Sequence, residues 1–325
     1  MSTVGATLFG AALWSLDQPQ PPLNHYSDLA APPSSSTDIT ASYETLCDQG
    51  LLNRERVATA FETVAPCLSG HLIAFVPPLL SDVWNPVNRF RLGEYLTPSC
   101  NATTCVAPVD SGAGVAANAA RLIEFLAAAR EPIWLITQSK GGVDVLDALV
   151  RRPDLVTRVA GWIALQAPFF GSPIADMASG GERAGKIVKG LAQLFSGDAA
   201  AVADLRTDVR RAYMASHAAA IRELARRINI LAVTMAPAPE GSLLSKIAPA
   251  IPTIPWMEGL GLENDGLVPV NAAILPGARY VKARGLIHGE PTLRPFVWSN
   301  ADDSAIAIRA YFALALGAQP NAGRA

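Results

Sequence analysis

Residues 133–142 read IWLITQSKGG, and this stretch decides the fold. Its first five residues form an apolar, β-type run, and residues 143–152 carry apolar side chains at helical spacing. Ser139 therefore stands in a tight turn between a strand and a helix. A serine hydroxyl is a weak nucleophile unless a base lies beside it and the backbone presents it clear of the sheet. A sharp turn does this, and Gly141 and Gly142 relieve its crowding, so we predict that Ser139 is a nucleophile rather than an ordinary helix cap.

Short apolar strands alternate with helices along most of the chain. The predicted strands are residues 71–76, 133–137, 159–165, 228–234 and 278–283, and the predicted helices are residues 116–130, 143–152 and 302–316. This alternation predicts an α/β fold, with a mostly parallel, doubly wound sheet covered by helices on both faces.

Three segments depart from this pattern. Residues 1–40 are rich in proline, which predicts an extended N-terminal segment. Residues 319–325 are expected to fray. Residues from about 174 to 226 form a helical excursion between two strands, with predicted helices at 184–195 and 199–215. We expect it to cover the carboxyl edge of the sheet, where open α/β folds bind ligands. The main domain is predicted to span residues 41–318.

The composition narrows the class of protein. A chain of 325 residues that is 50% hydrophobic and 17% charged suits one large α/β domain with a substantial core. Its formal net charge of -2 argues against a nucleic-acid partner. The apolar run Val4–Trp14 is about half the ~20 residues that a membrane span needs, and no Lys or Arg precedes Arg54. We therefore expect neither a transmembrane anchor nor an ordinary export signal.

The four cysteines are Cys47, Cys67, Cys100 and Cys105. No CxxC pair occurs among them, so the spacing does not match a zinc site. Two alternatives stay open: free thiols, or disulfides in which Cys100 and Cys105 bridge a tight loop. The compartment stays open: the missing export signal favours a cytoplasmic location, and secretion is the alternative if the cysteines pair.

Two later loops offer partners for the serine. Asp265 lies in a loop after the strand at 228–234, and His288 lies in a loop after the strand at 278–283. The carboxylate would hold the tautomer of the imidazole, which would carry the proton. For Asp265 the alternative is a plain Asp-Gly turn. The substitutes for it are Glu263 and, further away, Asp198, Asp204 and Asp208.

Histidine is scarce, which narrows the choice of base. His25 lies in the proline-rich segment, His71 opens a strand at the end away from Ser139, and His217 lies in the excursion. Only His288 follows the final strand in a loop.

An oxyanion intermediate needs two N–H donors. One is expected from Lys140, directly after the nucleophile. The other is expected from the loop after residues 71–76, where Pro77 and Pro78 have no N–H, so that Leu79 is the first donor and Leu80 the next. The alternative is a rigid turn without a catalytic role.

Four motifs resemble those of bacterial and fungal lipases of the α/β-hydrolase superfamily, over roughly residues 70–290. They are TQSKGG at 137–142, APFFGSPIAD at 167–176, NDGLVP at 264–269 and His-Gly at 288–289. Phe169 replaces the histidine that is usual in the second motif, and Pro77-Pro78 replaces the usual His-Gly of the oxyanion strand.

The resemblance implies an α/β-hydrolase fold and ester hydrolysis through an acyl-enzyme, without a cofactor or a metal. It implies a triad of Ser139, Asp265 and His288, with residues 174–226 as a lid. Leu80, Phe169 and Phe170 are expected to contact an apolar acyl group, although they would equally serve to pack the lid. The expected substrate is a small-molecule, lipid or polyester ester, and the oligomeric state is left open. The alternative functions are an acyltransferase and a hydrolase-fold binding protein without catalysis.

Overall fold

A parallel β-sheet forms the centre of the molecule. A computed structural model describes residues 23–48, 50–79, 81, 96, 100–179, 199–236, 253–285, 288 and 301–317. Seven strands form one sheet in the order β1-β9-β8-β7-β6-β4-β5, and each described pairing in it is parallel. Their bounds are β1 Thr37–Asp38, β4 Leu72–Val76, β5 Thr103–Val106, β6 Ile133–Gln138, β7 Val159–Leu165, β8 Asn229–Ala236 and β9 Arg279–Arg284. A small antiparallel hairpin joins β2 (Cys47–Asp48) to β3 (Leu51–Leu52).

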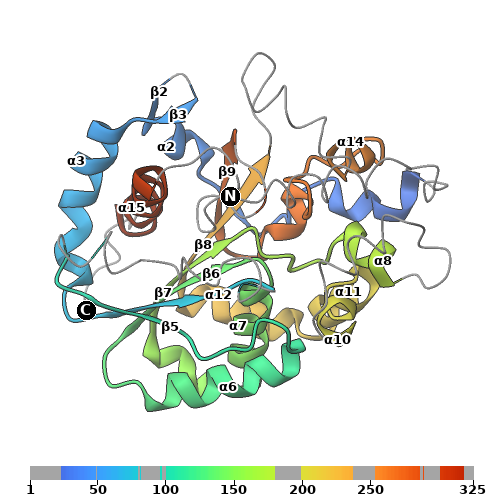
Figure 1. The fold of residues 1–325 in the computed structure, drawn as a ribbon, viewed down its shortest axis with the longest axis horizontal. Helices are drawn as coiled ribbons and strands as arrows, with labels where there is room; N and C mark the ends of the chain where they lie inside the picture. Colours follow the sequence, from blue (N-terminus) through green and yellow to red (C-terminus); the bar gives the residue numbers. More distant parts are fainter. Residues whose placement is uncertain are drawn as a thin grey trace, which may run out of the picture.

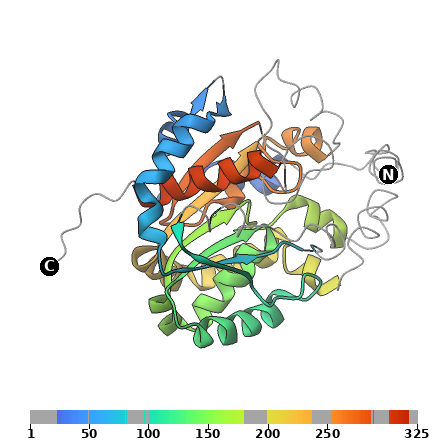
Figure 2. The ribbon, with the colours of Figure 1, turned by 60° about the vertical axis from the view of Figure 1, so that its left-hand side comes forward.

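Helices cover both faces of the sheet (Figures 1 and 2). Helices α3 (Arg54–Val64) and α15 (Ala301–Gly317) lie on one face, and α6 (Val115–Ala128), α7 (Lys140–Arg151) and α12 (Ala218–Arg227) lie on the other. The predicted doubly wound α/β sheet is therefore confirmed. The remaining helices are η1 Leu23–Leu29, α2 Thr40–Glu44, η2 Ala65–Leu68, η3 Pro153–Arg158, α8 Pro173–Ser179, α10 Ala199–Ala203, α11 Thr207–Ser216, α14 Thr253–Glu258 and η6 Val270–Ala273.

The first four residues of strand β6, 133–136, are all apolar because helices cover both faces of the strand. Trp134 and Ile136 point into the core beneath α3 and α15, whereas Ile133 and Leu135 point into the core beneath α6 and α7. Alternate residues of a strand face opposite sides, so a strand covered on both sides needs an unbroken apolar run. Each such side chain contributes about 1.5–3 kcal/mol when fully buried.

The strand order creates a switch point beside Ser139. From β4 the chain passes outward to β5, then returns to β6 on the other side of β4, and continues through β7, β8 and β9. The connections after β4 and β6 therefore diverge, which opens a crevice at the carboxyl ends of these two strands. Ser139 directly follows β6, so the topology puts it at this crevice.

Part of the proline-rich N-terminal segment is incorporated into the domain. Thr37 and Asp38 pair with β9 as the edge strand β1. Tyr26 and Leu29 of η1 are buried in a cluster with Trp256 of α14. Residues 1–22 and the predicted tail at 319–325 lie outside the described residues.

The described parts of the excursion are helices that pack on the domain. The predicted helix at 199–215 is interrupted between α10 and α11, because Arg206 adopts an extended backbone with ψ 147°. Asp176 of α8 fixes the start of α11 by accepting hydrogen bonds from the N–H and hydroxyl groups of Thr207, at 2.7 and 2.6 Å. Arg210 is buried and donates from Nε to the Phe169 carbonyl at 3.3 Å. The predicted helix at 184–195 lies outside the described residues, and a lid stays a prediction.

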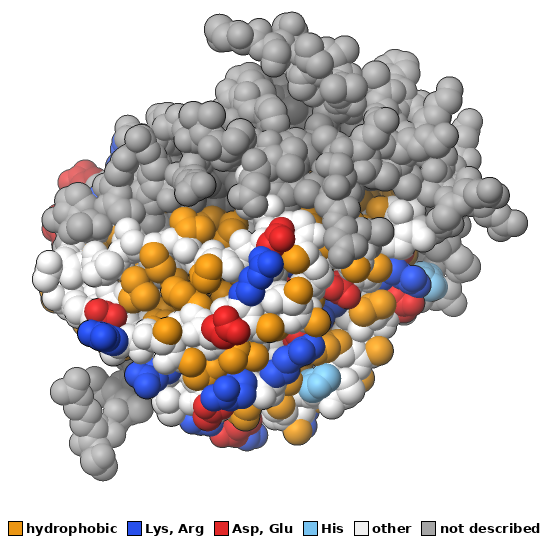
Figure 3. Space-filling view, turned by 60° about the horizontal axis from the view of Figure 1, so that its bottom comes forward, with side chains coloured by type: hydrophobic (Ala, Val, Ile, Leu, Met, Phe, Trp, Pro, Cys, Tyr) orange, Lys and Arg blue, Asp and Glu red, His pale blue; other side chains and the backbone are white. Residues whose placement is uncertain are grey.

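The structure also bears on the cysteines, on membrane-spanning helices and on the charged surface. All four cysteines are free. Within the part of the chain that the structure describes, none of the helices has both the length and the apolarity to span a bilayer. One face shows acidic and basic side chains close to one another (Figure 3). Among the described residues as a whole, the ion pairs include Arg226–Glu223 and Arg151–Asp147.

Candidate active site

Ser139 occupies a strained turn. Its φ of 52° and ψ of -124° lie outside the regions that L-residues usually adopt, which costs on the order of 1–3 kcal/mol and persists only when the surroundings fix it. The Ser139 N–H donates to the Leu165 carbonyl at 2.8 Å, and the Gly142 N–H donates to the Ser139 carbonyl at 3.0 Å. The adjoining strand and the first turn of α7 thus hold the residue from both sides.

Gly141 and Gly142 allow the start of α7 to approach its neighbours. A Cβ on Gly141 would lie 2.5 Å from the Val76 carbonyl oxygen, and one on Gly142 would lie 2.4 Å from Cβ of Ala167. Real side chains do not pack so closely, so both positions require glycine while the backbone stays in place. The loop after β4 therefore passes directly against the turn that presents Ser139.

Thr137 replaces the glycine that usually opens such a motif. Its hydroxyl oxygen accepts a hydrogen bond from Nε1 of Trp162 at 2.9 Å, and both residues are fully buried. A buried indole N–H needs an acceptor, and the threonine supplies one. The departure from glycine thus has a structural role in this chain.

The structure brings the three predicted triad residues together. His288 Nε2 lies 3.0 Å from Ser139 Oγ, and His288 Nδ1 lies 2.9 Å from Asp265 Oδ2. The His288 side chain is 12% exposed and that of Asp265 only 2%, so the acid is shielded while the imidazole stays accessible. Both distances fall within hydrogen-bonding range, and the first would allow direct proton transfer between Ser139 and His288.

The loop that carries Asp265 orients the carboxylate. Oδ1 accepts hydrogen bonds from the N–H groups of Leu267 and Val268, at 2.9 and 2.8 Å. This leaves Oδ2 for the imidazole. The His288 backbone N–H also donates to the Asp265 carbonyl at 2.8 Å, so the histidine is attached to this loop through its backbone as well as its ring.

Asn264 was not singled out from the sequence, although it supports this loop. Its amide donates to the carbonyls of Ile254 and Leu262, and its Oδ1 accepts from the Gly266 N–H at 2.9 Å. Asparagine and aspartate commonly bond to the backbone two residues ahead in turns. The order Asn-Asp-Gly could therefore have indicated from the sequence that Asn264 supports the turn at Asp265.

The substitute acids have other partners. Glu263 forms an exposed pair with Arg284 at 3.5 Å. Asp204 accepts from the Val115 N–H, and Asp208 pairs with Arg206. Asp198 lies outside the described residues. Among the candidate acids that the structure describes, Asp265 is the one that contacts the His288 imidazole.

The predicted oxyanion donors flank the same turn. Lys140 is the first residue of α7, so its N–H has no acceptor within the helix. Leu79 lies in the loop after β4 and packs, half-buried, against a cluster that includes Val143 and Ala175. Leu80 lies outside the described residues. The pairing of two donors on one oxygen stays a prediction.

Phe169 requires a correction. Its ring is fully buried and packs edge-on against Trp162, with the ring centroids 5.8 Å apart. It has no exposed surface to offer a substrate, so its role in this structure is packing. Phe170, next to it, stays partly exposed and remains a predicted substrate contact.

Two buried polar groups near Ser139 were missed in the sequence. Gln138 donates to Gln166 at 2.7 Å, which links the ends of β6 and β7. Lys140 pairs with Asp144 in the interior, and burial raises the pKa of Asp144 to about 6 although Lys140 and Asn118 oppose the rise. A polar residue inside a buried strand was the signal for Gln138. The pairing with Asn118 spans 26 residues and left no local signal.

Among the described residues, no cluster of three or more His, Cys, Asp or Glu side chains is placed to hold a metal ion.

The sheet, its switch point and the turn at Ser139 define an α/β-hydrolase fold. Solved structures with this fold resemble the chain. The metagenomic carboxyl esterase MGS0156 has a TM-score of 0.53 and 22% identity, with 76% of this chain and 73% of that chain covered. The mature Bacillus licheniformis lipase BlEst2 has a TM-score of 0.53 and 22% identity, with coverage of 66% and 84%. Its propeptide form has a TM-score of 0.55 and 21% identity, with coverage of 78% and 51%.

No protein-family model and no curated protein matches the sequence. The sheet topology and the similar solved structures show the α/β-hydrolase fold. They do not show the activity, which must be argued from the site.

Proposed function

We propose that the chain is a serine hydrolase that cleaves carboxylic esters through an acyl-enzyme intermediate. The observation that carries the proposal is the continuous set of contacts from Ser139 Oγ through His288 to Asp265. This arrangement activates a serine for acyl transfer. The names of the similar structures, a carboxyl esterase and a lipase, point to the same chemistry.

In the proposed mechanism, His288 Nε2 takes the proton from Ser139 Oγ as that oxygen attacks the ester carbonyl. Asp265 stabilises the imidazolium through Nδ1. The N–H groups of Lys140 and Leu79 would bind the oxyanion. His288 then protonates the departing alcohol. Water, activated by the same imidazole, hydrolyses the acyl-enzyme and restores the free serine.

The proposed substrate is an ester with an apolar acyl group, drawn from small molecules, lipids or polyesters. The support is two partly exposed apolar side chains, Leu79 in the loop after β4 and Phe170 in the segment after β7. The chemistry uses side chains and water alone, so the proposal includes no cofactor.

The experiment compares the wild type with Ser139→Ala on p-nitrophenyl esters of rising acyl length. We expect turnover by the wild type and its loss in the variant, with an unchanged melting temperature. Full turnover by the variant would refute the proposal. Product analysis with an added alcohol or amine separates hydrolysis from acyl transfer.

A further inference from the structure

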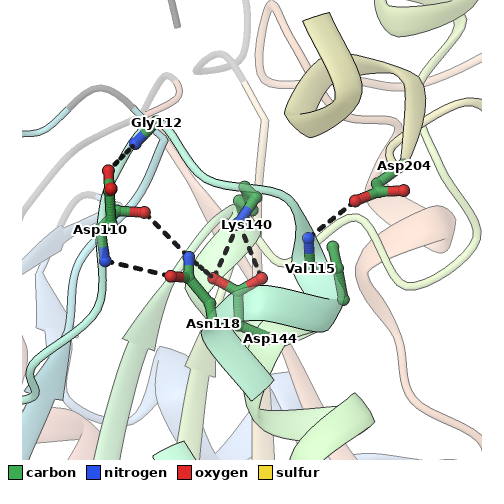
Figure 4. A network of polar contacts seen from close by, with 7 residues as sticks. All are labelled: Asp110, Gly112, Val115, Asn118, Lys140, Asp144 and Asp204. Carbon is green, nitrogen blue, oxygen red and sulfur yellow. Dashed lines mark hydrogen bonds and ion pairs between the residues drawn. The ribbon is translucent and has the colours of Figure 1, made fainter. Parts of the chain in front are cut away.

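A buried polar cluster surrounds the side chain of Lys140, the residue that directly follows Ser139 (Figure 4). The Lys140 side chain is 1% exposed, and its Nζ lies 2.8 and 2.9 Å from the two carboxylate oxygens of Asp144. Asn118 of α6 donates to the same carboxylate at 2.9 Å. We call Lys140, Asp144 and Asn118 the anchor cluster.

The anchor cluster connects α7 to the loop that precedes α6. Asn118 Nδ2 also donates to the Asp110 carbonyl at 2.9 Å, and the Asp110 N–H donates back to Asn118 Oδ1 at 3.0 Å. At the start of α6, the Val115 N–H donates to Asp204, which directly follows α10, at 2.7 Å (Figure 4). The first turn of α7 is thus tied to two other parts of the fold.

Stability alone gives a poor reason for this ion pair. Desolvating two charges costs several kcal/mol, and replacing a buried pair by apolar residues is often neutral or stabilising. The pKa of Asp144 stays raised, chiefly by burial, despite its contacts with Lys140. A buried pair of this kind serves better as a geometric restraint than as a source of stability.

The position of Lys140 indicates that role. It directly follows Ser139, whose φ of 52° must be maintained by its surroundings. The Lys140 N–H is also the first proposed oxyanion donor. The Lys140 side chain is held by both carboxylate oxygens of Asp144. This restrains the rotation of the peptide group of Lys140, and hence the direction of its N–H.

We propose that the anchor cluster is a positioning device that holds the Lys140 peptide N–H in the oxyanion hole. The inference rests on the proposed ester hydrolysis at Ser139. Lys140 and Asp144 form the restraint, and Asn118 attaches it to the neighbouring loop. A displacement of about 1 Å at a reacting centre can cost on the order of 10²-fold in rate.

The test uses the charge-free double variant Lys140→Met/Asp144→Leu, because either single change would leave one buried charge unpaired. Arg151→Met is the matched control, since Arg151 pairs with Asp147 on the same helix and at the same spacing, but at the end away from Ser139. Melting temperature, kcat, KM and the inhibition constant of an alkyl boronic acid are measured for each protein. The boronic acid forms a tetrahedral adduct on the serine and reports on the oxyanion hole.

We expect the double variant to melt near the wild type but to lose about 10- to 100-fold in kcat, with KM changed by less than about twofold. Boronic acid binding should weaken in parallel. Arg151→Met should leave kcat, KM and the inhibition constant unchanged and alter only the melting temperature, because it leaves the buried Asp147 without its ion-pair partner. A double variant with wild-type melting and wild-type kcat would overturn the inference. It would show that the ion pair can be replaced without any effect on the oxyanion hole. Should the double variant not fold, Asn118→Ala decides: a reduced kcat at constant KM supports the anchor, and an unchanged kcat overturns it.

Failure of the proposed function is distinguishable from failure of this inference. It would appear as Ser139→Ala retaining turnover in the same assay, whatever the anchor variants do.

Discussion

Asp265→Asn exchanges one carboxylate oxygen of the proposed triad for an amide nitrogen. The side chain keeps its shape, and its remaining oxygen would still accept from the N–H groups of Leu267 and Val268, which now lie 2.9 and 2.8 Å from Oδ1. The new NH₂ group would then face His288 Nδ1, where Oδ2 now lies 2.9 Å away. An NH₂ group donates, so Nδ1 must become the acceptor and Nε2 must carry the proton.

A protonated Nε2 cannot accept the proton of Ser139. We therefore expect kcat to fall about 10³- to 10⁴-fold, a loss of roughly 4–5.5 kcal/mol in transition-state stabilisation. KM and the melting temperature should change little, because the loop keeps its backbone hydrogen bonds. The assay is steady-state hydrolysis of a p-nitrophenyl ester, with thermal unfolding of the same samples. Retention of kcat within tenfold would refute the reasoning that Asp265 sets the tautomer.

Three further predictions concern the turn and its surroundings. Gly142→Ala would place a Cβ 2.4 Å from that of Ala167. We expect a loss of about 1–3 kcal/mol in the free energy of unfolding, measured by urea denaturation. A loss of less than about 0.5 kcal/mol would show that the backbone shifts freely. Thr137→Val removes the acceptor of the buried Trp162 indole and should cost about 1–3 kcal/mol in the same measurement, whereas Thr137→Ser should preserve the hydrogen bond and retain most of the stability. Asp144 has a folded-state pKa of about 6, above its ordinary 3.8, so its contribution to stability is present below about pH 4 and is lost as the pH rises through 6. The free energy of unfolding of Lys140→Met/Asp144→Leu relative to the wild type should therefore improve between pH 4 and pH 7, and a constant difference would contradict the raised pKa.

The sheet was predictable because its signals are local. The run at 133–137 is apolar on both faces, and the structure extends it by one residue to Gln138 as β6. The predicted strand at 159–165 matches β7, and the predicted helix at 302–316 differs from α15 by one residue at each end. Helix α3 and strand β5 were missed, since α3 is mostly polar and β5 has only four residues.

The residues of the proposed triad could be chosen from the sequence because few candidates existed. With four histidines in the chain, and one of them in a loop after the last strand, His288 required no knowledge of the third dimension. The packing around these residues could not be predicted from the sequence. Phe169 follows a proline in a motif that suggests a substrate contact, yet it points toward Trp162, and its sequence neighbours do not indicate this. The anchor cluster likewise depends on how α6 packs against α7.

The proposed hydrolysis depends most directly on Ser139 being a nucleophile. The measurement is the intact mass and peptide map of the protein after treatment with a fluorophosphonate. We predict one adduct per chain, located at Ser139, formed by the wild type and absent in Ser139→Ala. An unmodified wild-type protein, or an adduct on a different residue, would contradict the account.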